Sequence, residues 1–277
     1  MVNTSRCHTW NNLCRNRLKT YSMSDITLHK SKNAAFIGKD TSNFRSVKNY
    51  GLENAAVLQK PLASKTRQTV FFHEPVYILS GGSVAAQREG DGPIGTHFDY
   101  VIDAKEYSKN FELQEVDMLK RAIRIAVEKG GLMFEDVDML LAGDLLNQLT
   151  SSSYAARDLG LPYIGLYSAC STMSQALAVG ASFLNAGYFK HVACATVSHF
   201  ATAERQYRSP LEYGAQRPPY AQWTVTGAGC TILTNDKCCM KGQNPQSMPR
   251  ITSATYGKVL DFGIKDVANM GVAMAPA

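Results

Sequence analysis

The chain has 277 residues, 45% of them hydrophobic, which is enough to bury one large core or two moderate ones. Its seven cysteines show no regular spacing and no C-x-x-C pair, which excludes a secreted disulfide scaffold and argues against a structural zinc site. The net charge of +6 is unevenly divided: residues 1–67 carry twelve Lys and Arg against three Asp and Glu, and the other residues carry seventeen against twenty.

The basic charge therefore belongs to segment 1–67. This segment is rich in Asn, Ser, Thr and Lys and has no sustained apolar pattern, so we predict a basic, disordered leader. A basic arm of this kind can touch an anionic membrane or nucleic acid. We interpret it instead as a solvated tail and expect no nucleic-acid partner. No secretory signal is visible, and we expect a cytoplasmic protein.

From Gln68 onward the pattern is that of an α/β protein. We predict strands over 70–72, 76–79, 137–142, 163–167, 191–197, 230–233 and 251–255, and helices over 116–128, 151–159 and from Ser171 to Asn185. Ser80–Gly82 is a turn signal that closes the second strand, and the glycines and proline of 89–95 predict a loop. Strands that alternate with helices in this way predict a mostly parallel sheet with helices on both faces.

Residues 159–189 contain no charged side chain and are long enough to cross a bilayer. The segment also contains Pro162, four serines and four glycines, and it divides into strand, turn and helix. We therefore interpret it as a buried part of the α/β domain.

The strand–turn–helix around Cys170 is the most distinctive local feature. An apolar run from Tyr163 to Tyr167 ends in Ser168 and Ala169, and a helix follows the cysteine. The unpaired N–H groups and the dipole at a helix N-terminus favour a thiolate over a thiol. Small neighbours leave room for a ligand or an acyl group. The alternative is that Cys170 is a small buried hydrophobe at a strand end.

Several blocks from residue 66 to 277 resemble the stage V sporulation protein AD family, a thiolase-like family of spore-forming bacteria. The most specific blocks are Leu-Ala-Gly-Asp-Leu-Leu-Asn-Gln at 141–148 and Ala-Thr-Ala-Glu-Arg-Gln at 201–206. Further matches are Asp-Gly-Pro-Ile-Gly at 91–95, Ala-Cys-Ser-Thr at 169–172, Ser-His at 198–199, Glu-Tyr-Gly at 212–214, Thr-Val-Thr-Gly at 224–227 and the run ending Ala-Met-Ala-Pro-Ala at 277.

The resemblance implies a thiolase-like fold of two similar α/β halves. It also implies a non-enzymatic protein that binds dipicolinate (pyridine-2,6-dicarboxylate), either free or as its calcium complex, and aids its uptake into the forespore. Implied partners are the membrane proteins of the same operon, at the inner membrane of the forespore or spore, and a second copy in a homodimer. No cofactor and no metal site are implied.

The sequence departs from the family pattern at both ends. We assign residues 1–67 to the leader, 68–248 to a complete first half, and 249–277 to the start of a truncated second half. The catalytic His or Asn that a second thiolase half supplies would then be missing, so we expect no enzyme activity. An exposed apolar face would also remain where the second half packs.

Dipicolinate is a flat dianion, so its site needs hydrogen-bond donors, positive charge and an apolar slot. The resemblance places candidate residues at the carboxyl edge of the sheet, where α/β proteins bind ligands. Cys170 and the N–H groups of Ser171 and Thr172 form an anion-friendly turn. We read Asp144 as orienting a donor or bridging a cation. The other candidates are Asn147, Ser198, His199, Arg205 and Arg208.

Each candidate has an ordinary structural alternative. His199 fits a satisfied buried histidine as well as a ligand contact, and Arg205 and Arg208 fit surface arginines as well as bidentate carboxylate partners. Two other functions also stay open. Cys170 could be the nucleophile of a condensing-type acyltransferase with His199 as base, or the chain could be a truncated product without independent function.

Overall fold

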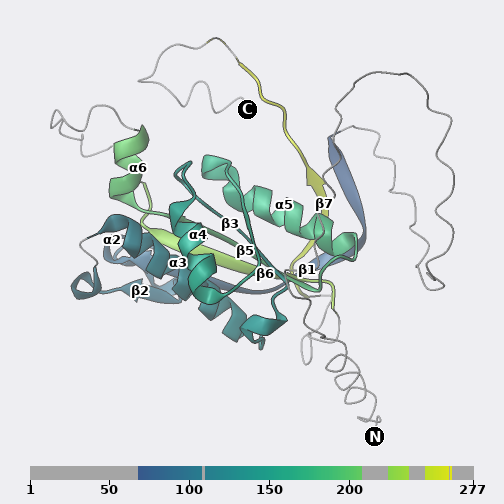
Figure 1. Cartoon of the computed structure of the whole chain (residues 1–277), viewed down its shortest axis with the longest axis horizontal. Coiled ribbons are helices and arrows are strands. Elements are labelled where there is room, and N and C mark those ends of the chain that lie inside the picture. Colours follow the sequence, from purple (N-terminus) through teal and green to yellow (C-terminus); the bar gives the residue numbers. More distant parts are fainter. Residues whose placement is uncertain (1–67, 108–109, 208–223, 237–246, 262, 264–277) are drawn as a thin grey trace, which may run out of the picture. The chain divides into compact units, whose positions relative to one another are not determined.

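A single mixed sheet organises the part of the chain that the computed structural model describes, namely residues 68–107, 110–207, 224–236, 247–261 and 263, with 204–207 described as backbone alone. The predicted leader and most of the segment after residue 261 lie outside this range. Figure 1 shows the sheet, whose strand order is β2-β1-β6-β5-β3-β4, with β7 paired to β1. The strands are β1 (Thr69–Ala86), β2 (Tyr100–Ile102), β3 (Met139–Asp144), β4 (Tyr163–Gly165), β5 (His191–Ser198), β6 (Gly227–Thr234) and β7 (Arg250–Thr255).

Most strands run in one direction, as predicted. β1 is parallel to β2, and β3 is parallel to both β4 and β5. β6 lies between β1 and β5 and is antiparallel to both, and β7 is antiparallel to β1. Strands β1 to β5 therefore share a direction that β6 and β7 oppose. Their carboxyl ends meet at one edge of the sheet.

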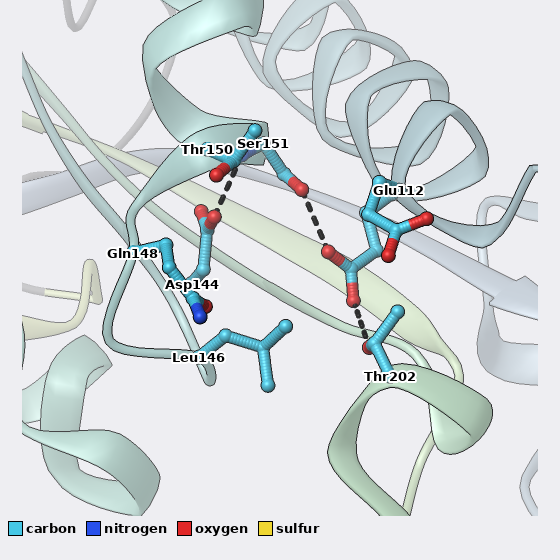
Figure 2. Close-up of a pocket in the computed structure, with 8 residues that line it drawn as sticks. Glu112, Asp144, Leu146, Gln148, Thr150, Ser151 and Thr202 are labelled. Atoms are coloured by element: carbon cyan, nitrogen blue, oxygen red, sulfur yellow. Dashed lines mark hydrogen bonds between the residues drawn. The ribbon is translucent and has the colours of Figure 1, made fainter. Parts of the chain in front are cut away.

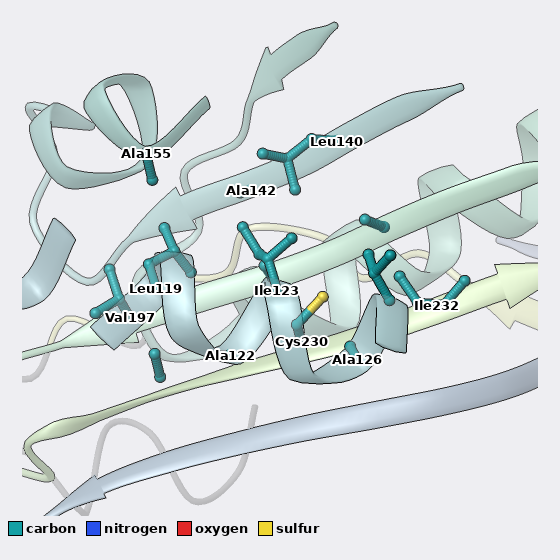
Figure 3. Packing of buried hydrophobic residues seen from close by; sticks show 14 of the residues in the cluster. Leu119, Ala122, Ile123, Ala126, Leu140, Ala142, Ala155, Val197, Cys230 and Ile232 are labelled. Atoms are coloured by element: carbon teal, nitrogen blue, oxygen red, sulfur yellow. The ribbon is translucent and has the colours of Figure 1, made fainter. Parts of the chain in front are cut away.

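Helices cover both faces of the sheet. The helices are α2 (Gln87–Gly90), α3 (Phe111–Lys129), α4 (Thr150–Leu159), α5 (Thr172–Asn185) and α6 (Phe200–Tyr207). α3 and α4 pack on one face, and Figure 3 shows Leu119, Ile123 and Ala126 of α3 against Leu140 of β3 and Ile232 of β6. The apolar side of α5 packs on the other face. Neighbouring residues of one strand belong to different cores because side chains alternate across a sheet.

The predicted turn at Ser80–Gly82 is wrong. β1 runs through it without a break, and Gly81 and Gly82 pair with Thr231 and Cys230 of β6. The glycine serves close packing: a Cβ on Gly82 would lie 2.2 Å from the carbonyl oxygen of Ala122 in α3. A helix that approaches a strand this closely requires glycine there.

The other predicted elements are present with shifted ends. α3 begins at Phe111, five residues before the predicted start, because the Asn110 side chain accepts a hydrogen bond from Leu113 N at 3.0 Å and caps the helix. β2, α6 and the short helix α2 were not predicted from the sequence. Residues 159–189 divide into β4, a turn and α5, as predicted. Among the described residues, no helix is long and apolar enough to cross a membrane.

Candidate functional site

Cys170 lies in a sharp turn between β4 and α5. Ala169 has φ +44°, which is uncommon for a residue other than glycine, and a short 3₁₀ turn over Ala169–Ser171 leads into the helix. Cys170 is exposed. The N–H groups expected to bind an anion are already used, because Ser171 N donates to Ser168 O and Thr172 N donates to Ala169 O. The turn is therefore held mainly by its own hydrogen bonds.

A cavity of about 360 Å³ opens beside Cys170 at the carboxyl edge of the sheet. Its polar lining residues are Ser83, Thr172, Thr196 and Ser198, and the Thr172 hydroxyl donates to Ala169 O at 2.9 Å. The hydroxyl of Ser198 donates to Val225 O at 2.7 Å. The apolar and glycine lining includes Val84, Phe98, Leu145, Met173, Gly227 and Gly229. None of the described lining residues carries a charge, so two predicted site residues, Cys170 and Ser198, meet in a neutral slot.

Gly227 and Gly143 allow the surrounding segments to approach closely. A Cβ on Gly227 would lie 2.7 Å from Val84 O, and one on Gly143 would lie 1.9 Å from Leu166 O. Gly227 therefore allows close packing of β6 against β1, and Gly143 allows close packing of β3 against the segment that leads to Cys170.

Asp144 faces a second cavity, of about 340 Å³, on the α3 side of the sheet. It is 2% exposed, and its two carboxylate oxygens accept from Ser151 N at 2.7 Å and Ser152 N at 2.8 Å. It thereby caps α4 from the end of β3, a position that suits a negative charge. Burial nevertheless raises the pKa of Asp144, against the effect of these hydrogen bonds. Both carboxylate oxygens of Asp144 are thus engaged in capping α4, and the residue does not line the Cys170 cavity.

Glu115 of α3 completes this second cavity and was not predicted from the sequence. Its side chain lies between α4 and α6: Ser151 Oγ donates to its Oε2 at 2.6 Å, and Thr202 Oγ1 lies 2.6 Å from its Oε1. Figure 2 shows these contacts beside Asp144 and Glu112. Burial raises the pKa of Glu115, hydrogen bonds from the two hydroxyls oppose the shift, and the negative charges of Asp144 and Glu112 add to it.

His199 lines a third cavity, of about 340 Å³, and not the one beside Cys170. It is 8% exposed, its Nδ1 accepts from Ala201 N at 3.0 Å, and its ring stacks on Phe111 with centroids 4.8 Å apart. These contacts match the alternative of a buried, satisfied histidine. Ser198 and His199 are neighbours on the chain, and they line different cavities at the edge of the sheet.

The remaining candidates are less informative. Asn147 is exposed in the turn between β3 and α4, and Ser171 is exposed at the start of α5. The backbone of Arg205 lies in α6, but its side chain is not described, and Arg208 lies outside the described residues. Among the described residues, no group of three or more His, Cys, Asp or Glu side chains is arranged to hold a metal ion.

Comparison of folds gives weak similarity to condensing enzymes. The 3-oxoacyl-[acyl-carrier-protein] synthase III of Aquifex aeolicus is 18% identical, with a TM-score of 0.42 over 58% of this chain and 54% of that protein. OleA of Xanthomonas campestris is 12% identical, with a TM-score of 0.42 over 59% of this chain and 57% of that protein. Similarity of this extent supports no conclusion about chemistry.

Sequence comparison is decisive. The family model of Stage V sporulation protein AD matches residues 66–277. A curated relative, "Stage V sporulation protein AD" of Bacillus subtilis (strain 168), is 42% identical over 212 residues, which are 76% of this chain and 60% of the relative. The chain thus spans about three fifths of that relative, and it belongs to the Stage V sporulation protein AD family.

Proposed function

We propose that this chain is part of a non-enzymatic dipicolinate-binding protein of bacterial spore formation, and that the ligand enters the cavity beside Cys170. The observation that carries the proposal is the shape and lining of that cavity. It has about 360 Å³ of space, mostly apolar walls and four serine or threonine residues in its lining, at the edge of the sheet where α/β proteins bind ligands. A flat ring with polar substituents is the kind of molecule that such a slot accepts.

The neutral lining bears on the form of the ligand. No described residue in the cavity offers a positive charge, and the N–H groups of Ser171 and Thr172 are engaged within the turn. Burying a dianion without a compensating charge costs several kcal/mol, by a rough estimate. The calcium complex, in which the cation neutralises both carboxylates, needs no such partner. We therefore propose the calcium complex as the bound form.

The acyltransferase alternative requires a base beside the thiol. His199 lines a different cavity, and no histidine is among the described residues that line the Cys170 cavity. No specific observation favours this alternative, so we place the binding role ahead of it.

We also propose that the protein is a homodimer and works with membrane proteins at the inner membrane of the forespore. Support for the dimer comes from β4, which among the described strands is an edge strand paired only with β3. Ile164 in β4 and Tyr167 just after it are 37% and 42% exposed. An exposed edge with apolar side chains is a ready surface for strand pairing with another chain.

Isothermal titration of the folded chain with dipicolinate, with and without calcium, tests the binding proposal. The decisive variant is Gly229→Val, because a Cβ at Gly229 meets only Met173 Cε at 3.8 Å and the added methyl groups project into the cavity. Gly81→Val is the matched control: it also adds a side chain to the central part of the sheet, but outside the cavity.

The proposal predicts saturable binding that is strengthened by calcium, weakened by Cys170→Ala, lost in Gly229→Val and kept in Gly81→Val. Picolinate, with one carboxylate, should bind more weakly. Absence of binding to the folded wild-type chain, or equal binding by Gly229→Val, would contradict it.

A further inference from the structure

The buried carboxyl group of Glu115 joins three helices. The residue belongs to α3 and is 1% exposed. Its Oε2 accepts from Ser151 Oγ in the first turn of α4, and its Oε1 lies 2.6 Å from Thr202 Oγ1 in the first turn of α6. Ser151 also donates its backbone N–H to Asp144, so the two buried carboxyl groups share one residue as partner.

The protons in this network can be counted. Thr202 Oγ1 has one hydrogen but lies near two acceptors, Glu115 Oε1 at 2.6 Å and His199 O at 3.0 Å. If Glu115 is protonated, its O–H donates to Thr202 Oγ1, and Thr202 donates to His199 O. If Glu115 is ionised, Thr202 must turn its hydrogen to the carboxylate and leave His199 O. That carbonyl then keeps the bond from Ala203 N at 3.0 Å.

The charges around the network favour the protonated form. The described charged side chains that act on Glu115 are Glu112 on its own helix and Asp144 from β3, and both are acidic. α4 contributes the hydroxyls of Ser151 and Ser152, and Ser152 shares a hydrogen bond with Tyr163 OH of β4 at 2.8 Å. The described part of α6 contributes the Thr202 hydroxyl. A second negative charge beside Asp144 would be buried without a described cation to balance it.

We infer that Glu115 is a proton-operated latch that holds the first turn of α6 to α3 and α4. With the proton in place, the chain Glu115–Thr202–His199 is continuous and the turn is closed. Loss of the proton removes the bond from Thr202 to His199 O, so that the bond from Ala203 N alone closes the turn, and it places a second buried negative charge beside Asp144. Opening of the turn hydrates that charge, so the turn opens more often. Because His199 and its stacking partner Phe111 line the third cavity, access to that cavity becomes dependent on pH.

Hydrogen exchange of the full chain tests this latch. The probe is the amide of Ala203, whose bond to His199 O closes the turn. Exchange is measured in steps from pH 5 to pH 9 and corrected for the intrinsic effect of pH. Opening that releases one proton becomes more frequent by up to about tenfold per pH unit between the unfolded carboxyl pKa and the raised pKa of the closed state, and it levels off above that. We expect this excess of opening in the wild-type chain and none in Glu115→Gln, which keeps a neutral donor.

Glu135→Gln removes a carboxylate from an exposed position in the 3₁₀ turn before β3 and should behave as wild type. No excess in the wild-type chain, or the same excess in Glu115→Gln, would overturn the inference.

A second pair of variants keeps the test decisive if Glu115→Gln fails to fold. Thr202→Ser retains the hydroxyl and should keep the pH dependence, whereas Thr202→Val should abolish it. An unchanged pH dependence in Thr202→Val would refute the relay through the hydroxyl.

Discussion

Gly143→Ala tests how tightly the end of β3 is packed against the turn that carries Cys170. The new Cβ would lie 1.9 Å from Leu166 O and 2.8 Å from Thr172 Cγ2, whereas real Cβ contacts stay above 3.0 Å. Leu166 must therefore move by more than 1 Å, and its N–H bond to Ala142 O at 2.9 Å is stretched. Overpacking costs about 1–3 kcal/mol and a weakened hydrogen bond about 1 kcal/mol, so we expect a loss of about 3 kcal/mol.

For a domain of this size, that loss lowers Tm by roughly 6–12 °C. Thermal and urea unfolding measure it directly, and titration with dipicolinate measures whether the displaced turn also weakens binding. Gly81→Ala is the control, because its Cβ meets only Cys230 O at 3.5 Å and its expected effect is below about 0.5 kcal/mol. If Gly143→Ala were as stable as Gly81→Ala, the close approach described here would be wrong.

Three further predictions concern helix capping, thiol reactivity and pH. Asn110→Ala removes the cap of α3 and should lower the free energy of unfolding, measured by urea titration, by about 1 kcal/mol. An unchanged free energy of unfolding would mean that water replaces the side-chain cap. Iodoacetamide should label exposed Cys170 well before Cys194 and Cys230, whose pKa values are raised by burial, and mass spectrometry of the digested chain would reveal any other order. Because burial raises the pKa of Glu115 in the folded state, its contribution to stability is complete below the unfolded pKa of 4.5 and is lost as pH rises through the folded pKa. Glu115→Gln should remove this decline. If the free energy of unfolding fell equally with pH in the wild-type chain and in the variant, the prediction would be contradicted.

The periodic features of the sequence predicted most of the fold. Alternating apolar strands and helices indicated the α/β class and located almost every large element within a few residues. The turn predicted at Ser80–Gly82 failed because glycine permits two different things, a turn and a close helix–strand contact, and sequence alone does not separate them. The strand β2 was missed because three residues are too few to show a pattern, and the helix α6 was missed because it depends on contacts with α3, which is distant in the chain.

The candidate site was predicted in part. The rule that ligands bind at the carboxyl edge brought Cys170 and Ser198 together correctly, but it says nothing about the face of the sheet. Since side chains alternate along a strand, Asp144 and His199 lie at cavities different from that of Cys170. Glu115 was missed because the predicted helix began at Val116, after this residue, and because glutamate side chains usually face water. Its spacing from Leu119 and Ala122, both buried on the same helix face, was the available signal.

The placement of β1 has a consequence for the order of folding. Apart from short β2, its partners are β6 and β7, so Val84 pairs with Ala228 and Thr69 pairs with Thr255. Contacts this far apart in the chain carry a large loop-closure cost, and proteins rich in them fold slowly. During synthesis, β1 and the open edge of β5 must wait for residues 227–234 to leave the ribosome. In that interval the nascent chain presents two strands that each have one open edge, and such edges favour aggregation.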